Sequence, residues 1–164
     1  MKIAEPFREM LLRLISENPG LHFRELQRRT DSAVGKLDYH LYQLERGGRI
    51  ISRKDAGNVR YFSSESGTIS DRRIAFYLRN KTGRELLLKA LSNKNGFSGL
   101  SFSEKENAMI RQMEKDGIIV VDGDGNRIRI EVRNRNELIS FLKRYGQSFV
   151  DSIALSILGL IDED

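Results

Sequence analysis

The sequence predicts a mostly α-helical protein with small β-hairpins, an α+β fold built from two successive domains and closing helices. Three observations support this prediction. Apolar residues recur at three- and four-residue steps in several stretches, which is typical of amphipathic helices. Two of these stretches are followed by β-rich runs that turn at glycine-containing segments, as hairpins do. The chain has 164 residues, of which 39% are hydrophobic and 31% charged, as in a folded globular protein.

The first two helices are predicted from their ends. Residues 5–17 carry an apolar stripe and stop before Pro19, whose ring does not fit inside a helix. A shorter helix is expected over residues 23–29. His22 is placed as its N-cap, and Glu25 follows three residues later to complete a capping box.

The third helix is predicted over residues 33–46 and a hairpin over residues 49–62. The helix ends at two glycines that suit a carboxyl-terminal cap, and the hairpin turns at Ala56 and Gly57. One apolar stripe is expected to face the core, formed by Val34, Leu37, Leu41 and Leu44. Helical geometry then turns a second set outward or to the flank, namely Gly35, Lys36, Tyr39, His40 and Gln43.

A second domain is predicted over residues 83–135, joined to the first domain (1–66) by a helix within residues 67–82. It repeats the element order of the first domain. The shared register is visible where QLERGGRII at residues 43–51 aligns with QMEKDGIIV at residues 112–120.

Residues 136–164 are predicted to form two closing helices, 136–145 and 147–161. The second helix is apolar on more than one side, so it is expected to have more than one neighbour. One side can pack on the protein's own second domain, and the other is predicted to pair two copies into a homodimer. The apolar residues are Phe149, Val150, Ile153, Ala154, Leu155, Ile157, Leu158, Leu160 and Ile161.

Charge and composition narrow the possible functions. The net charge of +5 favours anionic partners, and the basic surplus lies upstream of residues 136–164, which hold two basic and five acidic side chains. The absence of cysteine and the presence of only two histidines argue against a metal site or a nucleophilic catalytic site. No enzyme activity and no cofactor are therefore predicted. Without an apolar membrane span or a signal peptide, the expected location is cytoplasmic.

Three helices followed by a hairpin are the parts of a winged helix-turn-helix. NPGLHFRELQRR at residues 18–29 and GKLDYHLYQLERGGRI at residues 35–50 resemble the tandem winged-helix transcriptional regulators of archaea, relatives of the ArsR and MarR groups. The resemblance implies sequence-specific binding of double-stranded DNA. It also implies that residues 33–46 form the recognition helix and residues 49–62 the wing.

The residues support DNA contact on separate grounds. Residues 22–60 hold nine basic and five acidic side chains, a surplus that attracts phosphate without choosing a sequence. Lys36 supplies a cation and Gln43 an amide, groups that pair with guanine and adenine edges. The candidate DNA-binding residues are Arg28, Arg29, Ser32, Gly35, Lys36, Tyr39, His40, Gln43, Arg53, Lys54 and Arg60.

Two other interpretations stay open. Winged helices also serve as protein–protein modules, so the alternative function is an adaptor in a transcription or replication assembly without a specific DNA site. A basic helix face is also often solvated and nothing more. His40 fits a partly buried core position as well as it fits a base contact.

The second domain departs from the family pattern. GFSGLS at residues 96–101 leaves its second helix shortened or lost, and the next helix opens with Glu104 and Glu106, where phosphate would lie. We interpret this domain as a degenerate winged helix used for packing or pairing. Residues 122–126 begin like a calcium loop but lack its later ligands, so they are predicted to form a hairpin turn. The following strand carries basic residues that suit weak contact with flanking DNA: Arg127, Arg129 and Arg133.

Overall fold

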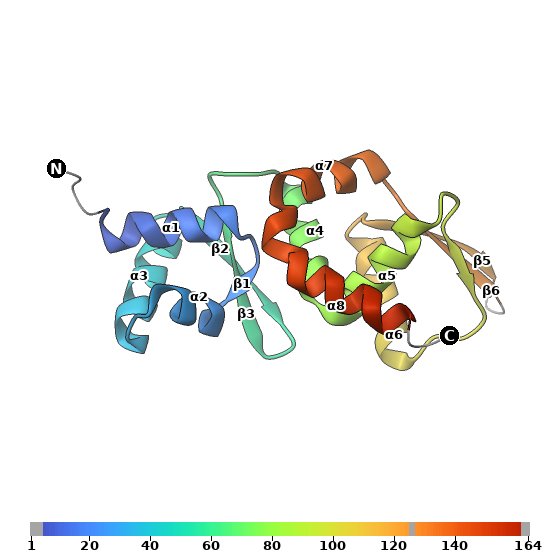
Figure 1. The fold of residues 1–164 in the computed structure, drawn as a ribbon, viewed down its shortest axis with the longest axis horizontal. Helices are drawn as coiled ribbons and strands as arrows, with labels where there is room; N and C mark the ends of the chain where they lie inside the picture. Colours follow the sequence, from blue (N-terminus) through green and yellow to red (C-terminus); the bar gives the residue numbers. More distant parts are fainter. Residues whose placement is uncertain (1–4, 125–126, 162–164) are drawn as a thin grey trace. The chain divides into compact units, whose positions relative to one another are not determined.

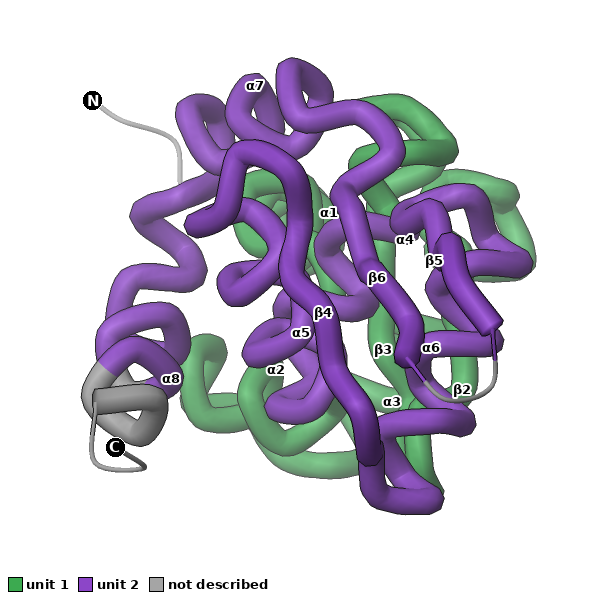
Figure 2. The backbone as a smooth tube through the Cα atoms, turned by 90° about the vertical axis from the view of Figure 1, so that its right-hand side faces the viewer, with its two compact units in different colours: residues 1–72 green, residues 73–164 purple. Residues whose placement is uncertain are grey.

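The computed structural model describes residues 5–124 and 127–161. The chain divides into two compact units, unit 1 (residues 1–72) and unit 2 (residues 73–164), as Figures 1 and 2 show. Each unit combines α-helices with a small three-stranded antiparallel sheet. The predicted α+β fold class is confirmed.

Unit 1 has the element order of a winged helix-turn-helix. Along the chain it contains α1 (Phe7–Glu17), β1 (Leu21–His22), α2 (Phe23–Thr30), α3 (Val34–Arg46), β2 (Ile50–Asp55) and β3 (Asn58–Ser63). The strands are ordered β1-β3-β2, with β3 in the middle. The hairpin of β2 and β3 matches the prediction, whereas the pairing of β1 with β3 is an addition to it. A two-residue strand has too few positions to show an alternating pattern.

One apolar cluster joins α1, α2, α3 and the sheet of unit 1. Leu37, Leu41 and Leu44 of α3 are all buried in it. Burial of a side chain of this size is worth about 1.5–3 kcal/mol. The prediction that Val34 belongs to the same stripe is wrong, because 58% of it is exposed at the first turn of α3.

Local structure defines both ends of α2, including the turn that leads to α3. The predicted capping box at the start of α2 is confirmed, since the Glu25 N–H donates to His22 Nδ1 and the His22 N–H donates to the Glu25 carboxylate. At the other end, Asp31 caps α2 in the left-handed conformation with φ of 47°. The hydroxyls of Thr30 and Ser32 lie 2.8 Å apart across this turn.

Arg60 departs from its expected place on an exposed wing. It lies on β3, but only 8% of the residue is exposed. Its Nε donates to the Asp55 carboxylate at 2.7 Å, and its Nη1 donates to the carbonyl of Gly20 at 3.0 Å. The guanidinium therefore joins the hairpin to the segment that precedes β1. We remove Arg60 from the candidates for DNA contact.

Unit 2 begins within α4 (Ile69–Arg79) and has the same sheet plan as unit 1. Its further elements are α5 (Lys81–Ser92), β4 (Phe97–Gly99), α6 (Glu104–Lys115), β5 (Ile119–Asp124), β6 (Arg127–Val132), α7 (Arg135–Tyr145), the 3₁₀ turn η1 (Gly146–Phe149) and α8 (Val150–Ile161). The strands are ordered β4-β6-β5. In unit 1, Ile50 of β2 pairs with Ser63 of β3. The corresponding pair in unit 2 is Ile119 of β5 with Val132 of β6, as the aligned sequences predict.

The two units differ between the first strand and the helix that follows it. In unit 1, β1 leads directly into α2, whereas in unit 2 residues 100–103 connect β4 to α6 without a helix. The expected loss of this helix is confirmed. Ser103 caps α6 instead, in a capping box with Glu106. Of the predicted turn at residues 122–126, residues 125 and 126 lie outside the described part of the chain.

A buried arginine attaches α8 to the rest of unit 2. Arg84 of α5 donates from Nε to the hydroxyl of Ser156 at 2.7 Å and from Nη1 to the carbonyl of Leu78 at 2.8 Å. Phe149, which precedes α8, is fully buried under the guanidinium of Arg79. The outer side of α8 exposes 48% of Val150 and 46% of Ile157. In the predicted apolar set, the side chains of Leu155, Leu158, Leu160 and Ile161 lie outside the described part.

Replacing Arg60 with methionine is expected to lower the free energy of unfolding of the protein by about 3 kcal/mol, because it removes one partner of a buried ion pair. Urea denaturation followed by circular dichroism measures the change. Lys54→Met is the matched control, since Lys54 is an exposed residue of the neighbouring strand. Equal stability of the two variants would contradict a structural role for Arg60.

Candidate nucleic-acid interface

The outer face of α3 is the side opposite its buried leucines. Because Leu37, Leu41 and Leu44 fix the inward direction, positions four and seven residues apart on the far side form one exposed stripe. This outer stripe consists of Gly35, Tyr39, Tyr42 and Arg46, all exposed. More than half of each tyrosine is accessible. The stripe therefore offers one cation and two aromatic rings to a partner.

Tyr42 and Arg46 are additions to the predicted site. The predicted outward set ends at Gln43 and includes neither residue. Their positions follow from the same helical spacing, since Tyr42 lies seven residues after Gly35 and Arg46 seven residues after Tyr39. Gln43 itself is half-buried beside this stripe.

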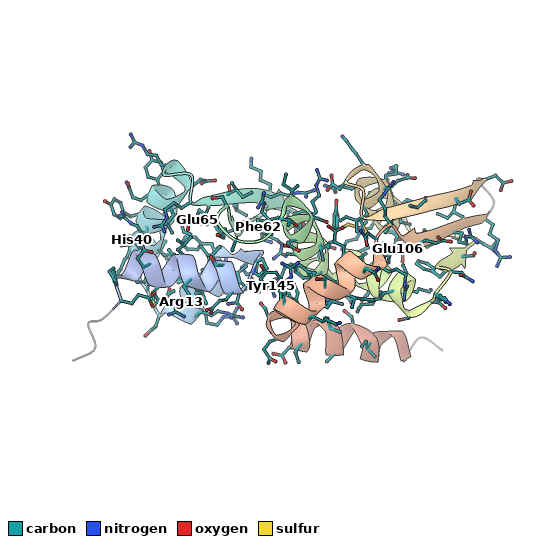
Figure 3. All side chains as sticks on the ribbon, turned by 90° about the horizontal axis from the view of Figure 1, so that it is seen from above. Arg13, His40, Phe62, Glu65, Glu106 and Tyr145 are labelled. Carbon is teal, nitrogen blue, oxygen red and sulfur yellow. The ribbon has the colours of Figure 1, made fainter. Side chains whose placement is uncertain are left out.

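One flank of α3 packs against the start of α1. The His40 ring lies 4.9 Å from the Phe7 ring, and Arg8 Nε donates to His40 Nδ1 at 3.4 Å. Figure 3 shows His40 where these two helices meet. Lys36 Nζ lies 4.3 Å from the centre of the same Phe7 ring and forms a cation–π interaction with it. His40 is thus part of the packing between α1 and α3.

The surroundings of His40 disfavour its protonation. Burial lowers the pKa of its imidazole, and the positive charges of Arg8 and Lys36 lower it further. The neutral ring can then accept the hydrogen bond from Arg8. This geometry favours His40 as a residue that orients α3.

The other flank of α3 is acidic and faces the hairpin. Glu45 accepts a hydrogen bond from the Ser52 hydroxyl of β2 at 2.5 Å. Burial raises the pKa of the Tyr61 hydroxyl on β3, and the negative charges of Glu45 and Asp38 add to this effect. The outer stripe of α3 therefore lies between a basic flank and an acidic flank.

The remaining candidates lie beside α3. Arg28 and Arg29 are exposed at the end of α2, and Arg29 Nη1 donates to Asn18 Oδ1 at 3.2 Å. Ser32 lies in the turn before α3, where its hydroxyl contacts Thr30. Lys54 is exposed near the end of β2, and Arg53 beside it is half-buried.

The hairpin turn is short and fixed by its backbone. Ala56 and Gly57 both have positive φ angles, 46° and 85°. Two consecutive residues in this conformation are the mark of a type I′ turn, whose twist matches the strands that it joins. The turn therefore keeps β2 and β3 paired through Lys54, close to the tip of the hairpin.

The described residues contain neither a candidate metal site nor a candidate membrane-spanning helix. No group of three or more His, Cys, Asp or Glu side chains in residues 5–124 and 127–161 is arranged to hold a metal ion. Over the same ranges, no helix combines the length and the apolar character needed to cross a bilayer.

The first part of the chain is similar in sequence to a known helix-turn-helix family. Residues 5–74 match the sequence model of a family described as an N-terminal HTH domain. The match includes every element from α1 to β3 and reaches into α4. The element order of unit 1 and this sequence similarity both support a helix-turn-helix arrangement.

The chain is also similar to a longer protein that is named as a regulator. It is 29% identical over 126 residues to an uncharacterized HTH-type transcriptional regulator of Methanocaldococcus jannaschii. The matched region is 74% of this chain and 32% of that protein. The chain therefore spans about a third of the length of this relative.

Proposed function

We propose that the protein is a DNA-binding transcriptional regulator that inserts the outer stripe of α3 into the major groove. The observation that carries this proposal is the exposure of Tyr39, Tyr42 and Arg46 on the second helix of a helix-turn-helix domain. In this motif the second helix lies in the groove, and its side chains contact base edges. The similarity to a protein named as a transcriptional regulator supports the same role.

The residues of the proposed interface divide into those that read bases and those that bind phosphate. Arg46 and Lys36 suit guanine, and Gln43 suits adenine, because their donors and acceptors match those edges. Tyr39 and Tyr42 add aromatic surface beside them. Arg28, Arg29 and Lys54 lie at the ends of α2 and of the hairpin, where contact with the backbone positions the domain.

The asymmetric charge of α3 gives the proposed complex a preferred orientation. Its α1 flank carries Lys36 and its hairpin flank carries Asp38 and Glu45. Phosphate is attracted to the first flank and repelled by the second. Asp38, exposed near the start of the helix, can accept a hydrogen bond from the amino group of cytosine.

Unit 2 is assigned a supporting role in this proposal. The first turn of α6 carries Glu104 and Glu106, which oppose phosphate at the position of a recognition helix. On its wing, Arg129 pairs with Glu131 at 3.0 Å and with Asp122 at 3.8 Å. These acidic partners reduce the charge that the strand offers to DNA.

A protein–protein adaptor is the second candidate function. It is favoured by the apolar and aromatic side chains that unit 1 exposes: Val34 (58%), Ile51 (41%), Tyr39 (55%) and Tyr42 (57%). Binding to a random-sequence duplex separates the two functions. A regulator binds it with steep salt dependence, whereas an adaptor need not bind it.

Replacing Arg28 or Lys54 with alanine is expected to weaken binding to all duplexes alike. Each lost phosphate contact should reduce the slope of log K against log[salt] by about 0.9. Fluorescence anisotropy of a labelled random duplex over a range of salt concentrations measures the slope. Lys94→Ala, an exposed lysine of unit 2, is the control and should leave it unchanged. An unaltered slope in the Arg28 and Lys54 double variant would exclude both residues from the interface.

Replacing Arg46 or Gln43 with alanine is expected to relax sequence preference at one or two base positions. The expected loss is about 1–3 kcal/mol at each affected position if the contact is bidentate. Selection of bound duplexes from a random pool, repeated for each variant, measures the preference. Lys54→Ala should retain the wild-type motif with lower affinity. If both α3 variants retain it as well, they contact the backbone and not the bases.

We further propose that the protein is a homodimer paired through the outer side of α8. Val150, Ala154 and Ile157 are exposed at four- and three-residue steps, while Ser156 on the inner side is bound to Arg84. The inner side is therefore already occupied, and the outer side is open to a second copy. Two domains related by a twofold axis would contact two half-sites, which a single small domain cannot.

The double variant Val150→Glu and Ile157→Glu is expected to be monomeric at micromolar concentration, because charges replace the apolar contact. Sedimentation equilibrium of the variant and the wild type measures the mass. Asp151→Lys, on the same helix, is the control for a change of charge alone. A monomeric wild type would contradict the proposal, and a variant that remains dimeric would move the interface away from α8.

A further inference from the structure

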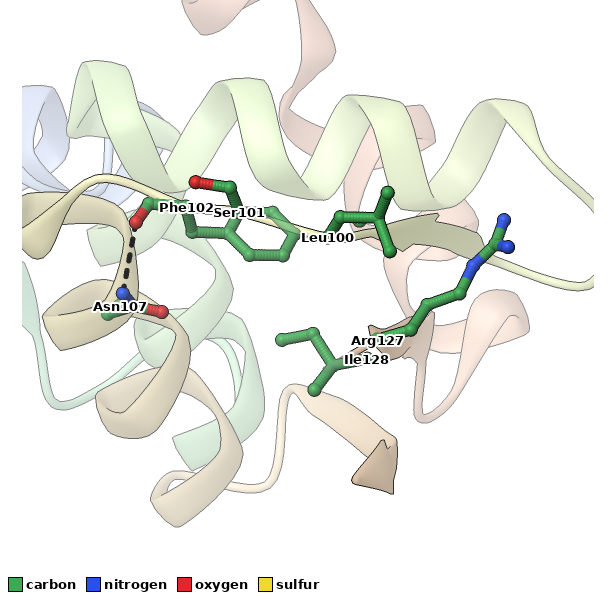
Figure 4. Close-up of a pocket in the computed structure, with 7 residues that line it drawn as sticks. Leu100, Ser101, Phe102, Asn107, Arg127 and Ile128 are labelled. Atoms are coloured by element: carbon green, nitrogen blue, oxygen red, sulfur yellow. Dashed lines mark hydrogen bonds between the residues drawn. The ribbon is translucent and has the colours of Figure 1, made fainter. Parts of the chain in front are cut away.

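Unit 2 contains a pocket beside the segment that connects β4 to α6, the segment that corresponds in chain order to α2 of unit 1. The pocket has a volume of about 390 Å³ and lies between residues 99–102, α6 and the start of β6 (Figure 4). Pockets that hold small molecules have volumes of about 300–1,000 Å³. Leu100, Phe102 and Ile128 supply its apolar lining, and Asn107 and Arg127 supply polar groups.

The pocket follows from the missing helix. In unit 1, Leu26 of α2 and Leu37 of α3 are fully buried in the same cluster. In the aligned sequence, Glu106 stands where Leu37 stands in unit 1, and it is used in the capping box of α6. Neither the helix nor its apolar contact is present in unit 2. Leu100 is accordingly 74% exposed at the rim of the pocket.

The lining of the pocket is held in place by the surrounding structure. Asn107 Nδ2 donates to the carbonyl of Phe102 at 3.1 Å, and the Phe102 ring packs against the Phe97 ring. The Phe102 ring also lies so close to Gly99 that a Cβ atom there would collide with it. These contacts fix the segment that replaces the helix, so the pocket is pre-formed.

The polar groups of the pocket define the chemistry of a ligand. Since the Asn107 amide nitrogen is used by the Phe102 carbonyl, its Oδ1 is the end that can accept a hydrogen bond from a ligand. Arg127 is an exposed cation on the opposite side of the lining, on β6 (Figure 4). A guanidinium binds carboxylates strongly because it can donate two parallel hydrogen bonds. The apolar residues between them suit a short hydrocarbon group.

We propose that this pocket binds a small organic carboxylate in which a short hydrocarbon or aromatic group separates the carboxylate from a hydroxyl or amino donor. In this arrangement the carboxylate pairs with Arg127, and the donor binds Asn107 Oδ1. The hydrocarbon group lies against Leu100, Phe102 and Ile128. The inference concerns unit 2 alone and does not depend on DNA binding by unit 1.

The test uses the intact ¹⁵N-labelled protein and two probes, 4-hydroxyphenylacetate and its neutral amide, in which the ring separates the hydroxyl donor from the carboxyl end. The acid is expected to cause saturable changes in the amide resonances of residues 99–107 and 127–128. The neutral amide should bind about tenfold more weakly or not at all, because it cannot form the ion pair. Absence of saturable changes with the acid, or equal binding of the two probes, would overturn the proposal.

Two substitutions at one exposed position test the charge requirement without disturbing the core. Leu100→Glu places an acid beside Arg127 and should abolish binding of the acid probe. Leu100→Lys loses the same apolar contact without adding a negative charge, so it should weaken binding much less. Arg127→Gln should weaken binding about tenfold. Lys94→Glu, at an exposed position outside the pocket lining, is the control for net charge. Equal binding by the two Leu100 variants would contradict this site.

Discussion

The orientation of α3, and with it the outer surface of unit 1, depends on the burial of Leu37, Leu41 and Leu44. These three side chains fix the rotation of α3 about its own axis, because each would lose about 1.5–3 kcal/mol if it turned toward water. The rotation in turn decides which residues face outward. His40 and Phe7 on one flank, and Glu45 with Ser52 on the other, hold the helix in the same orientation. The surface proposed for DNA is thus a consequence of the core beneath it.

The two units show how one sheet plan supports two different surfaces. The middle strand is the last in both units, and the pairing registers correspond. In unit 1, α2 covers the cluster and leads through the turn at Asp31 into α3. In unit 2, residues 100–103 stand in place of that helix along the chain, and a pocket lies beside them. The two units therefore differ by one helix, which is present beside the surface proposed for DNA and absent beside the pocket.

The sequence was sufficient for the elements with a strong local signal. Helical spacing and the capping box predicted α2 and α3, and the glycine turn predicted the hairpin. The burial of Arg60 had no local signal, because its partners Asp55 and Gly20 meet it only in the folded sheet. The exposure of Tyr42 and Arg46 can be predicted from the sequence, since both lie opposite the three leucines on the helix. The pocket of unit 2 cannot be predicted from it, because its lining comes from three separate segments and depends on a helix that is missing.

The central claim is that the outer stripe of α3 is the surface that contacts DNA. Titration of the intact ¹⁵N-labelled protein with a random-sequence duplex at low salt tests it most directly. The account predicts that amide resonances of residues 34–46, together with those near Lys54, change first and most strongly. Resonance changes confined to unit 2, or none at all, would contradict it.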